Sequence, residues 1–289
     1  MLDSRRDYTG RVLGSWHLVR PLGKGASGVV YEARHKVIPG RLAAVKLLHP
    51  HLAQDPESRR RFLNEATAVS RADHENIVQI FDGGVTDDGL CYVVMELLTG
   101  RSLAELLRAG PLDVPRTLNV AAQVTAALAA AHGLGIVHRD LKPQNVMLCQ
   151  RPGQGELVKV VDFGIARALE PDQRMTMVGA VLGTPDYMSP EQARGAGDVD
   201  ARSDVFSLGL LTCRMLSGSI PFSGTGRTPI EQIVARAMLR EPPPPLRQLR
   251  PDLSPALEAA LLRALEPDPQ RRTPTARQFA EELEAAARS

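Results

Sequence analysis

Residues 138–145 read His138-Arg139-Asp140-Leu141-Lys142-Pro143-Gln144-Asn145, and the rest of the chain is organised around them. The stretch holds a carboxylate that can accept a proton, a lysine two positions later and a carboxamide oxygen at its end. Phosphoryl transfer needs these groups: a base for the attacking hydroxyl, a cation for phosphate charge and an oxygen ligand for Mg²⁺. A second, acidic metal ligand is also needed, and Asp162-Phe163-Gly164 supplies a candidate. Taken alone, Asp140 could equally be a helix cap or a turn residue.

The composition is that of an ordinary globular protein and does not favour nucleic acid as a partner. Of 289 residues, 43% are hydrophobic and 24% are charged, and 35 Lys plus Arg face 33 Asp plus Glu. No polybasic run stands out, so the charge pattern of a nucleic-acid-binding surface is missing. The length suffices for one two-lobed unit or for two modest domains.

The cysteines and the apolar stretches bear on the compartment. The 3 cysteines are far apart and odd in number, which excludes a disulfide framework and a CxxC metal site. The first ten residues lack the apolar core of a secretory signal. Residues 118–132 form an Ala-rich stretch that polar residues interrupt, so we expect a buried helix there and no membrane span. A reducing, cytoplasmic location is the natural expectation.

Residues 22–31 contain a glycine segment, Leu22-Gly23-Lys24-Gly25-Ala26-Ser27-Gly28-Val29-Val30-Tyr31. A dinucleotide-binding GxGxxG would open a helix, whereas the residues after Gly28 are β-branched and aromatic and favour a strand. We therefore predict strand, glycine turn, strand, with a nucleotide beneath the hairpin. The missing glycine side chains would let the backbone approach phosphates closely. Hairpins also use glycines simply to turn, so the segment is weak evidence alone.

Lys46 is the single lysine of a short apolar strand, Ala43-Ala44-Val45-Lys46-Leu47-Leu48. In isolation, such a lysine is more often a solvated charge that blocks an edge strand. A helix with Glu65 follows, and this carboxylate is a candidate partner for the lysine. The alternative partner of Glu65 is Arg61, four residues earlier on the same helix face.

The remaining pattern divides the chain near Thr99-Gly100. Before this point, residues 74–96 read as two strands joined by a turn at Asp87-Asp88-Gly89, which completes an antiparallel sheet of about five strands. After it, helical patterns dominate and include residues 203–209, 257–265 and 276–287. Four prolines at 242–245 require an extended linker. The chain begins with a polar lead-in without sustained apolar periodicity.

In order along the chain, these motifs resemble those of Ser/Thr protein kinases, and most closely the bacterial eukaryotic-like (Hanks-type) kinases. The motifs are GKGASG, AVK, Glu65, HRDLKPQN, DFG, GTPDYMSPE, SDVFSLG and PQRR. The resemblance implies an α+β, bilobal fold with a small antiparallel sheet and one main helix in the first lobe. It assigns a lead-in to residues 1–15, the N-lobe to 16–95, the hinge to 96–98, the mainly helical C-lobe to 99–283 and the C-terminal end to 284–289.

The resemblance implies ATP and Mg²⁺ as cofactors, with Mn²⁺ as an alternative metal. Asp162 and Asn145 would hold the metal, Asp140 would accept the proton of the substrate hydroxyl, and Lys142 would neutralise phosphoryl charge. Lys46, steered by Glu65, would bind the α- and β-phosphates. ATP would lie between the lobes, and its further contacts would be Leu22, Gly23, Gly25, Gly28, Val30, Ala44, Met95, Glu96, Leu98 and Met147. The apolar members of this set could instead merely fill the core.

Two features of the resemblance imply serine or threonine as the acceptor in a protein substrate. Lys142, two positions after Asp140, is typical of Ser/Thr kinases, and Thr184 resembles the threonine that bonds the catalytic aspartate in them. Arg139 implies control, because a buried arginine beside a catalytic carboxylate needs an anion partner. Between Gly164 and Gly183 only Thr176 offers a hydroxyl. We therefore expect autophosphorylation at Thr176, in trans through a transient homodimer; the alternative is an ordinary exposed loop residue.

Three further residues would have structural roles. Glu191 would pair with Arg272 to anchor the activation segment, the stretch that contains Thr176. Asp204 would hold the backbone of the catalytic loop at residues 138–145. Ser189, Gln144 and Phe206 depart from the commonest residues at their positions without removing a required charge. The alternatives to an active kinase are a pseudokinase scaffold that binds nucleotide and a kinase-fold enzyme acting on small molecules. The presence of Lys46, Asp140, Asn145 and Asp162 disfavours the scaffold, and the GTPDYMSPE segment disfavours small-molecule substrates.

Overall fold

The structure is a computed structural model, and it describes residues 7–151, 153, 155–163, 185–195, 199–221 and 246–288. The described residues form two compact units. The first comprises residues 7–73 and 77–99, and the second comprises residues 74–76 and the described residues from Gly100 onward. Pro242 to Pro245, predicted as an extended linker, lie outside the described residues.

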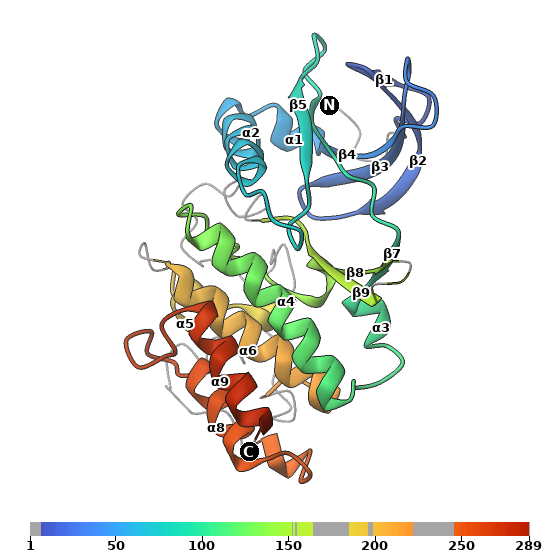
Figure 1. The fold of residues 1–289 in the computed structure, drawn as a ribbon. Coiled ribbons are helices and arrows are strands. Elements are labelled where there is room, and N and C mark those ends of the chain that lie inside the picture. The colour runs from blue at the N-terminus through green and yellow to red at the C-terminus, as the bar shows by residue number, and fades with distance from the viewer. Residues whose placement is uncertain are drawn as a thin grey trace. The chain divides into compact units, whose positions relative to one another are not determined.

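The first unit is built on a six-stranded antiparallel sheet with the order β1-β2-β3-β4-β6-β5 (Figure 1). Its strands are β1 (Val12–Leu13), β2 (Trp16–Lys24), β3 (Gly28–His35), β4 (Leu42–Leu48), β5 (Ile80–Val85) and β6 (Cys91–Met95). The predicted strand–turn–strand around the glycine segment is confirmed by β2 and β3. β4 lies inside the sheet between β3 and β6, so Lys46 is not on an edge strand.

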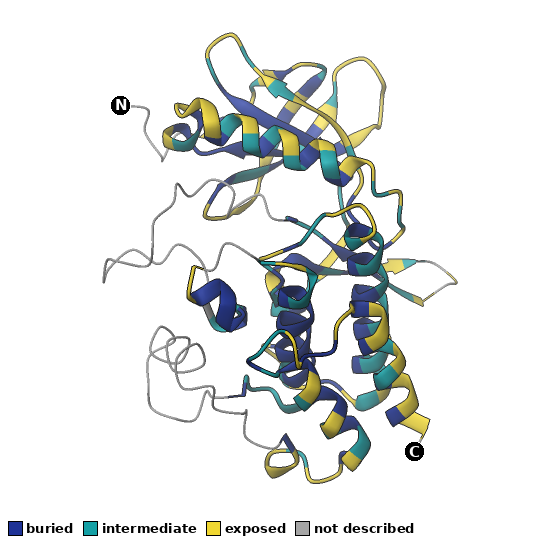
Figure 2. Ribbon diagram, turned by 90° about the vertical axis from the view of Figure 1, so that its left-hand side faces the viewer, coloured by how far each residue is buried: buried dark blue, intermediate teal, exposed yellow. Residues whose placement is uncertain are grey.

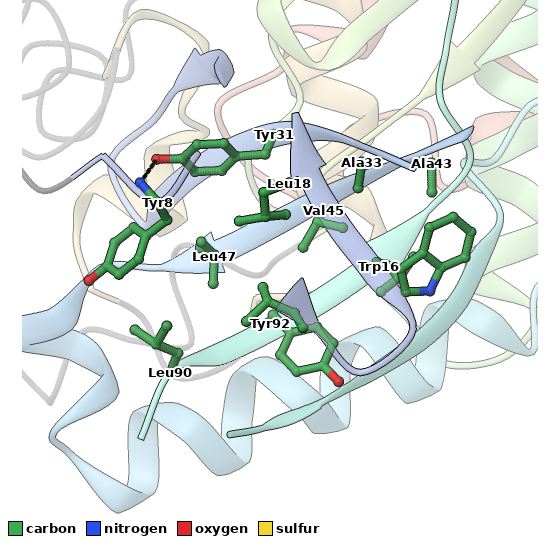
Figure 3. Close-up of a cluster of buried hydrophobic side chains, with 12 residues drawn as sticks. Tyr8, Trp16, Leu18, Tyr31, Ala33, Ala43, Val45, Leu47, Leu90 and Tyr92 are labelled. Carbon is green, nitrogen blue, oxygen red and sulfur yellow. Dashed lines mark hydrogen bonds between the residues drawn. The ribbon is translucent and has the colours of Figure 1, made fainter. Parts of the chain in front are cut away.

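Alternate residues of β4 and β6 face two apolar clusters on opposite sides of the sheet. Val45, Leu47, Tyr92 and Val94 join one cluster with Trp16 and Leu18 (Figure 3). On the other side, Leu48, Cys91 and Val93 pack with Phe62 and Ala66. The last two belong to helix α2 (Pro56–Ser70), which begins at an Asp55 cap followed by proline and lies after the short helix α1 (Pro50–Ala53). Helix α2 therefore covers the face of the sheet that carries Lys46.

The expectation of a polar lead-in before Trp16 was wrong for its second half. β1 pairs with β2, and Leu13 is fully buried. The Tyr8 backbone N–H donates to the Tyr31 hydroxyl at 3.2 Å (Figure 3). Single apolar residues separated by glycines have no period to detect, yet each fills a place in the core. This short strand also explains why the sheet has six strands where about five were predicted.

The second unit combines a small sheet with helices. The sheet has the order β7 (Gly100–Ser102), β8 (Val146–Arg151) and β9 (Gly155–Val160). The longer helices are α4 (Val114–His132), α6 (Ala201–Ser217), α8 (Pro255–Ala264) and α9 (Ala276–Arg288). The short elements are α3 (Leu103–Leu106), η1 (Pro143–Asn145), η2 (Pro185–Tyr187), α5 (Pro190–Ala193) and η3 (Leu246–Gln248).

The longer helices of the second unit differ in how far their residues are buried (Figure 2). Almost every side chain of α6 from Ser203 to Leu216 is buried, which makes it the central support of its unit. α4 buries one side and leaves most of the other half-buried, whereas α9 buries one side and exposes most of the other. The Ala-rich stretch of α4 is thus the predicted buried helix. Among the helices that the structure describes, none is both long and apolar enough to cross a membrane.

Candidate active site

The loop at residues 138–142 is held by one fully buried carboxylate, that of Asp204 on α6. Its two oxygens accept the backbone N–H groups of His138 and Arg139, each at 2.8 Å, and Oδ2 also lies 2.7 Å from His132 Nε2. Arg139 has a φ of 63°, an unusual backbone conformation for a residue other than glycine. The Asp204 carboxylate therefore stabilises a strained turn directly before Asp140, as expected from the sequence.

The β8–β9 hairpin brings together two residues that are far apart in sequence. At its base Val146 pairs with Val160, and the next N–H, of Val161, donates to the Asn145 carbonyl at 2.9 Å. Asn145 and Asp162 consequently flank the same end of the hairpin. Asp162 also has a positive φ, of 59°. A backbone register thus places the two candidate metal ligands as neighbours.

Asp140 is surrounded by the other polar groups of its loop. Its Oδ2 accepts a hydrogen bond from Lys142 Nζ at 2.7 Å and one from Asn145 Nδ2 at 3.2 Å. Asn145 Nδ2 also donates to the Asp140 carbonyl at 2.8 Å. Within the part of the chain that the structure describes, Oδ1 of Asp140 has no hydrogen-bond donor near it. That oxygen remains able to accept a proton from a hydroxyl group.

The donor set around Asn145 and Asp162 fits a hard divalent cation. Because Asn145 Nδ2 is directed to Asp140, the carboxamide oxygen of Asn145 faces away from it. A carboxamide oxygen beside a carboxylate suits Mg²⁺, which prefers oxygen ligands and keeps several waters or phosphate oxygens. No cluster of three or more His, Cys, Asp or Glu side chains occurs among the described residues.

Two rings connect the loop to the residue after Asp162. The His138 and Phe163 rings lie 4.6 Å apart between centroids, and both side chains are buried. His138 Nε2 lies 3.1 Å from the Val161 carbonyl oxygen, so it is the protonated nitrogen that donates there. These contacts fix the loop against the end of the β8–β9 hairpin.

In the first unit, His49 forms hydrogen bonds to the glycine turn between β2 and β3. The His49 Nε2 lies 2.9 Å from the Gly25 carbonyl oxygen, and its backbone N–H donates to the Ser27 carbonyl at 2.9 Å. Burial of the ring lowers the pKa of His49, an effect that the Gly25 bond only partly opposes. A neutral ring with its proton on Nε2 fits this contact.

The glycines of this turn differ in what they require. A Cβ on Gly28 would lie 2.0 Å from the Leu47 carbonyl oxygen, so Gly28 is required by close packing on β4. A Cβ on Gly25 would be 3.9 Å from its nearest neighbour, and one on Gly23 would contact nothing within 4 Å. The expectation that these glycines let the backbone approach phosphates stays a prediction, and the close contact with β4 is a second reason for glycine at position 28. Space for a ligand beside the backbone remains at Gly23 and Gly25.

Lys46 is buried, with 4% of its surface exposed, and pairs in register with Val30 and Val93. It shares a strand face with Ala44 and Leu48, the face covered by α2. Glu65 is half-buried on α2. Arg61, its alternative partner, forms an ion pair with Glu57 one turn earlier. The burial of Lys46 excludes a solvated blocking charge.

The other predicted ATP-binding residues of the first unit lie on its strands and at its end. Ala44 on β4 is buried and pairs with Met95 on β6, while Leu22 on β2 is exposed. Val30 on β3, Glu96 and Leu98 are half-buried. The Glu96 backbone N–H donates to the Gln79 carbonyl at 2.9 Å. Met147 lies in the second unit on β8, paired with Lys159 and Ser102.

The ion pair expected between Glu191 and Arg272 is present and buried. Arg272 Nη1 lies 2.7 Å from Oε1 of Glu191 and Nη2 lies 3.0 Å from Oε2. Ser203 adds a hydroxyl bond to the same carboxylate at 2.6 Å. Burial favours the neutral acid, but the bonds and charge of Arg272 outweigh it, so the pKa of Glu191 is lowered. The Arg272 guanidinium also stacks 4.9 Å over the Phe206 ring.

The predicted regulatory residues are only partly described. Arg139, expected to be a buried arginine, has an exposed side chain. The residue is held through its backbone N–H and carbonyl, which bond to Asp204 and Gln192. Thr176 and Thr184 lie outside the described residues.

Sequence reasoning missed two residues that contact the site. His49 has no motif of its own, because its partner is a backbone carbonyl. Gln192 on α5 donates to the Arg139 carbonyl at 2.9 Å. The Ser189-Pro190-Glu191-Gln192 pattern is a recognisable capping box, which would have located the start of α5 but not this long-range bond.

Comparisons with known proteins show the family of the chain. Residues 16–283 match the family model described as protein kinase domain. The chain is 42% identical over 286 residues to serine/threonine-protein kinase Pkn1 of Myxococcus xanthus, covering 99% of this chain and 40% of that protein. It is 37% identical over 277 residues to PknJ of Mycobacterium tuberculosis, covering 96% of this chain and 46% of PknJ.

Among solved structures, the PknI kinase domain of M. tuberculosis superposes with a TM-score of 0.76 at 30% identity. The match covers 98% of this chain and 100% of that structure. In contrast, the chain spans 40% of Pkn1 and 46% of PknJ, so it corresponds to less than half the length of these two curated relatives.

Proposed function

This chain belongs to the protein kinase family, of the bacterial Hanks-type serine/threonine branch, and we propose that it transfers the γ-phosphoryl group of ATP to serine or threonine hydroxyls of proteins. The bilobal α+β fold is that of the family. One observation carries the proposal beyond family membership. Asp140, Lys142 and Asn145 contact one another beside Asp162, and all four groups that phosphoryl transfer requires are retained.

Asp140 is the proposed base. Its Oδ2 is occupied by Lys142 and Asn145, which leaves Oδ1 to accept a hydrogen bond from the substrate hydroxyl. The hydroxyl oxygen bonds to the γ-phosphorus, the bond from that phosphorus to the β–γ bridging oxygen breaks, and the hydroxyl proton passes to Asp140. The products are a phosphorylated side chain and ADP.

Lysines supply positive charge at two points of the proposed reaction. Lys142 neutralises charge on the transferring phosphoryl group, and its contact with Asp140 keeps its ammonium in place. Lys46 binds the α- and β-phosphates, with Glu65 steering its side chain. The burial of Lys46 supports this role, because a buried ammonium retains its charge only with anionic partners.

Asn145 and Asp162 would hold the divalent metal, which we propose to be Mg²⁺, with Mn²⁺ as a substitute. When bound, the metal neutralises phosphate charge and orients the phosphates for in-line attack. Leu22, Val30, Ala44 and Met147 would contact the adenine, and Met95 would close the back of its pocket. The backbone from Glu96 to Leu98 would hydrogen-bond the base, and the turn at Gly23, Gly25 and Gly28 would cover the phosphates.

Serine or threonine is the proposed acceptor because of Lys142 and Thr184, as in related enzymes that are named serine/threonine-protein kinases. Since the reaction consumes ATP, we propose that the domain works in the cytoplasm. Glu191 and Arg272 would anchor the activation segment between them, and Asp204 would hold the catalytic loop.

Transfer of labelled phosphate from ATP to a generic basic protein tests this function. Asp140→Asn is the matched control, because it keeps the shape of the side chain and removes the base. We expect transfer by the unmutated chain to Ser or Thr and a loss of about 10²- to 10⁴-fold in the variant. ATP binding without transfer would favour the pseudokinase scaffold. Transfer to small molecules but not to protein would favour a kinase-fold enzyme that acts on small molecules.

Regulation by phosphorylation forms a second part of the proposal. Autophosphorylation of Thr176, in trans within a transient homodimer, would give Arg139 an anionic partner and order the segment. The exposed Arg139 side chain is accessible to such a phosphate. Mass spectrometry before and after incubation with ATP and Mg²⁺ measures the modification. Full activity without phosphate at Thr176 would contradict this regulation while leaving the catalytic proposal intact.

A further inference from the structure

Gln192 forms hydrogen bonds in two directions, and their chemistry fixes how its side-chain amide is oriented. Its Oε1 accepts from the Ser189 backbone N–H at 3.1 Å and from the Ser189 hydroxyl at 3.2 Å. A backbone N–H can only donate, so the amide oxygen must face Ser189. The amide nitrogen then faces the Arg139 carbonyl oxygen, 2.9 Å away. Gln192 is buried, with 5% of its surface exposed.

The carbonyl that Gln192 binds belongs to the peptide group directly before Asp140. The Arg139 carbonyl and the Asp140 N–H lie in one planar unit. The Asp140 N–H in turn lies 3.2 Å from His138 Nδ1. Fixing the Arg139 carbonyl therefore fixes the plane from which the Asp140 side chain projects.

Arg139 needs such support because its backbone is strained. Its φ is 63°, and its N–H is bound by Asp204 on α6 at 2.8 Å. Gln192 on α5 binds the other polar group of the same residue. Residues on two helices therefore stabilise the strained turn: α6 binds the N–H of Arg139, and α5 binds its carbonyl.

α5 is itself anchored, so it provides a firm support for Gln192. Glu191, the preceding residue, is bound by Arg272 and by the Ser203 hydroxyl on α6. Before α5, the Tyr187 carbonyl accepts a bond from the Ser207 hydroxyl at 2.7 Å. A shift of α5 would therefore move the donor that holds the peptide before Asp140.

We propose that Gln192 is a positioning residue for Asp140, acting through the Arg139 carbonyl. The inference rests on the proposed phosphotransfer function and extends it to a residue outside the reacting groups. It predicts that the donor nitrogen of Gln192, and not its capping oxygen, sets the rate of the chemical step. A residue that only caps α5 would affect stability instead.

Two variants and one matched control separate these roles. Gln192→Glu keeps the oxygen that accepts from Ser189 and loses the donor; Gln192→Met loses both without adding charge. Ser189→Ala removes the capping hydroxyl but keeps the backbone N–H, so the amide orientation persists. We expect kcat to fall about 10- to 100-fold in both Gln192 variants, with KM for ATP within about twofold of the unmutated protein. Ser189→Ala should keep kcat within about twofold.

Hydrogen–deuterium exchange gives a readout that does not depend on turnover. Exchange of the segment at residues 137–141 should accelerate in both Gln192 variants and stay unchanged in Ser189→Ala. Unchanged kcat in folded Gln192 variants, or an equal loss in Ser189→Ala, would overturn the inference. Absence of phosphoryl transfer by the unmutated chain would instead refute the proposed function. The exchange data would still test whether the bond from Gln192 to the Arg139 carbonyl holds the loop.

Discussion

Arg272 and Glu191 are separated by 81 positions in the sequence and meet in a bidentate ion pair at 2.7 and 3.0 Å. The Arg272 guanidinium is fully buried, and its remaining N–H groups bond to the carbonyls of Glu266, Arg202 and Pro267. Each N–H group of the side chain therefore has an acceptor inside the protein. Such a pair is costly to break because either partner alone would be a buried, unpaired charge.

Replacing Arg272 should destabilise the protein strongly. Arg272→Ala leaves the Glu191 carboxylate buried without its cation, and we expect a loss of about 3 to 5 kcal/mol in the free energy of unfolding. Chemical denaturation measures this value. Arg271→Ala is the control, because that neighbouring side chain is 74% exposed and forms only a long ion pair. Equal stability of the two variants would contradict a structural role for the buried pair.

The same pair predicts a pH dependence of stability. The folded-state pKa of Glu191 lies below its ordinary value of 4.5. Its contribution is therefore fully present above about pH 4.5 and is lost as the pH falls through the lower, folded-state pKa. Urea unfolding measured from about pH 6 downward should reveal a decline that is smaller in Glu191→Gln. A parallel decline in both proteins would assign the acid sensitivity to other carboxylates.

Alanine at two glycines of the same turn should have different effects. In Gly28→Ala the Cβ would lie 2.0 Å from the Leu47 carbonyl, which forces β3 and β4 apart and costs about 2 to 3 kcal/mol of stability. Gly25→Ala has space and should stay within about 0.5 kcal/mol. Thermal unfolding distinguishes them. If Gly25→Ala were the more destabilising change, the close contact on β4 would not be what requires glycine.

His49 should influence ATP binding through the Gly25 carbonyl. His49→Phe keeps a buried ring but removes the donor, so the proposed phosphate cover loses a hydrogen bond. We expect KM for ATP to rise about 2- to 10-fold, as one net hydrogen bond implies, with little change in kcat. His49→Gln can return an amide N–H to the position of Nε2 and should restore KM. Failure of this rescue would show that ring packing, rather than the bond, matters at position 49.

Asp204 and Asp200 allow the same chemical change to be compared on one helix. Asp204→Asn replaces an oxygen that faces backbone N–H groups with an NH₂ group, so we expect a loss of about 2 to 4 kcal/mol and at least about a tenfold drop in kcat. Asp200 caps α6, asparagine caps equally well, and the ion pair with Arg202 that would be lost lies at the surface, so Asp200→Asn should keep kcat and change stability by less than about 1 kcal/mol. Measured kcat and unfolding free energy check both expectations. Normal activity of Asp204→Asn would exclude the carboxylate as the support of the catalytic loop.

The local elements could be predicted from the sequence wherever one short pattern carried the signal. β-branched residues after Gly28 predicted a strand, and β3 begins at Gly28. The division near Thr99 followed from a change of period, and one of the boundaries at which the chain passes from the first unit to the second falls between Thr99 and Gly100. The Glu191–Arg272 pair was expected from family motifs, not from local pattern.

What could not be predicted depends on partners that carry no side-chain signature. The bonds of His49 and Gln192 end on backbone carbonyls, and any residue could provide these. Tyr8 and Leu13 are isolated apolar residues whose burial follows from their strand neighbours, not from a repeat. The exposure of the Arg139 side chain was missed because residue type alone does not fix how far a side chain in a loop is buried.

In the β8–β9 hairpin, the pairing of the strands, and not closeness in sequence, brings Asn145 near Asp162. The pairing of Val146 with Val160 at its base, and the bond from the Val161 N–H to the Asn145 carbonyl, set how near Asn145 lies to Asp162. A single residue inserted between Asn145 and Val146 would shift this register and separate the two candidate metal ligands. The two strands therefore act as a ruler for the site, and the length of chain at the base of the hairpin is fixed by the metal that the two residues would share.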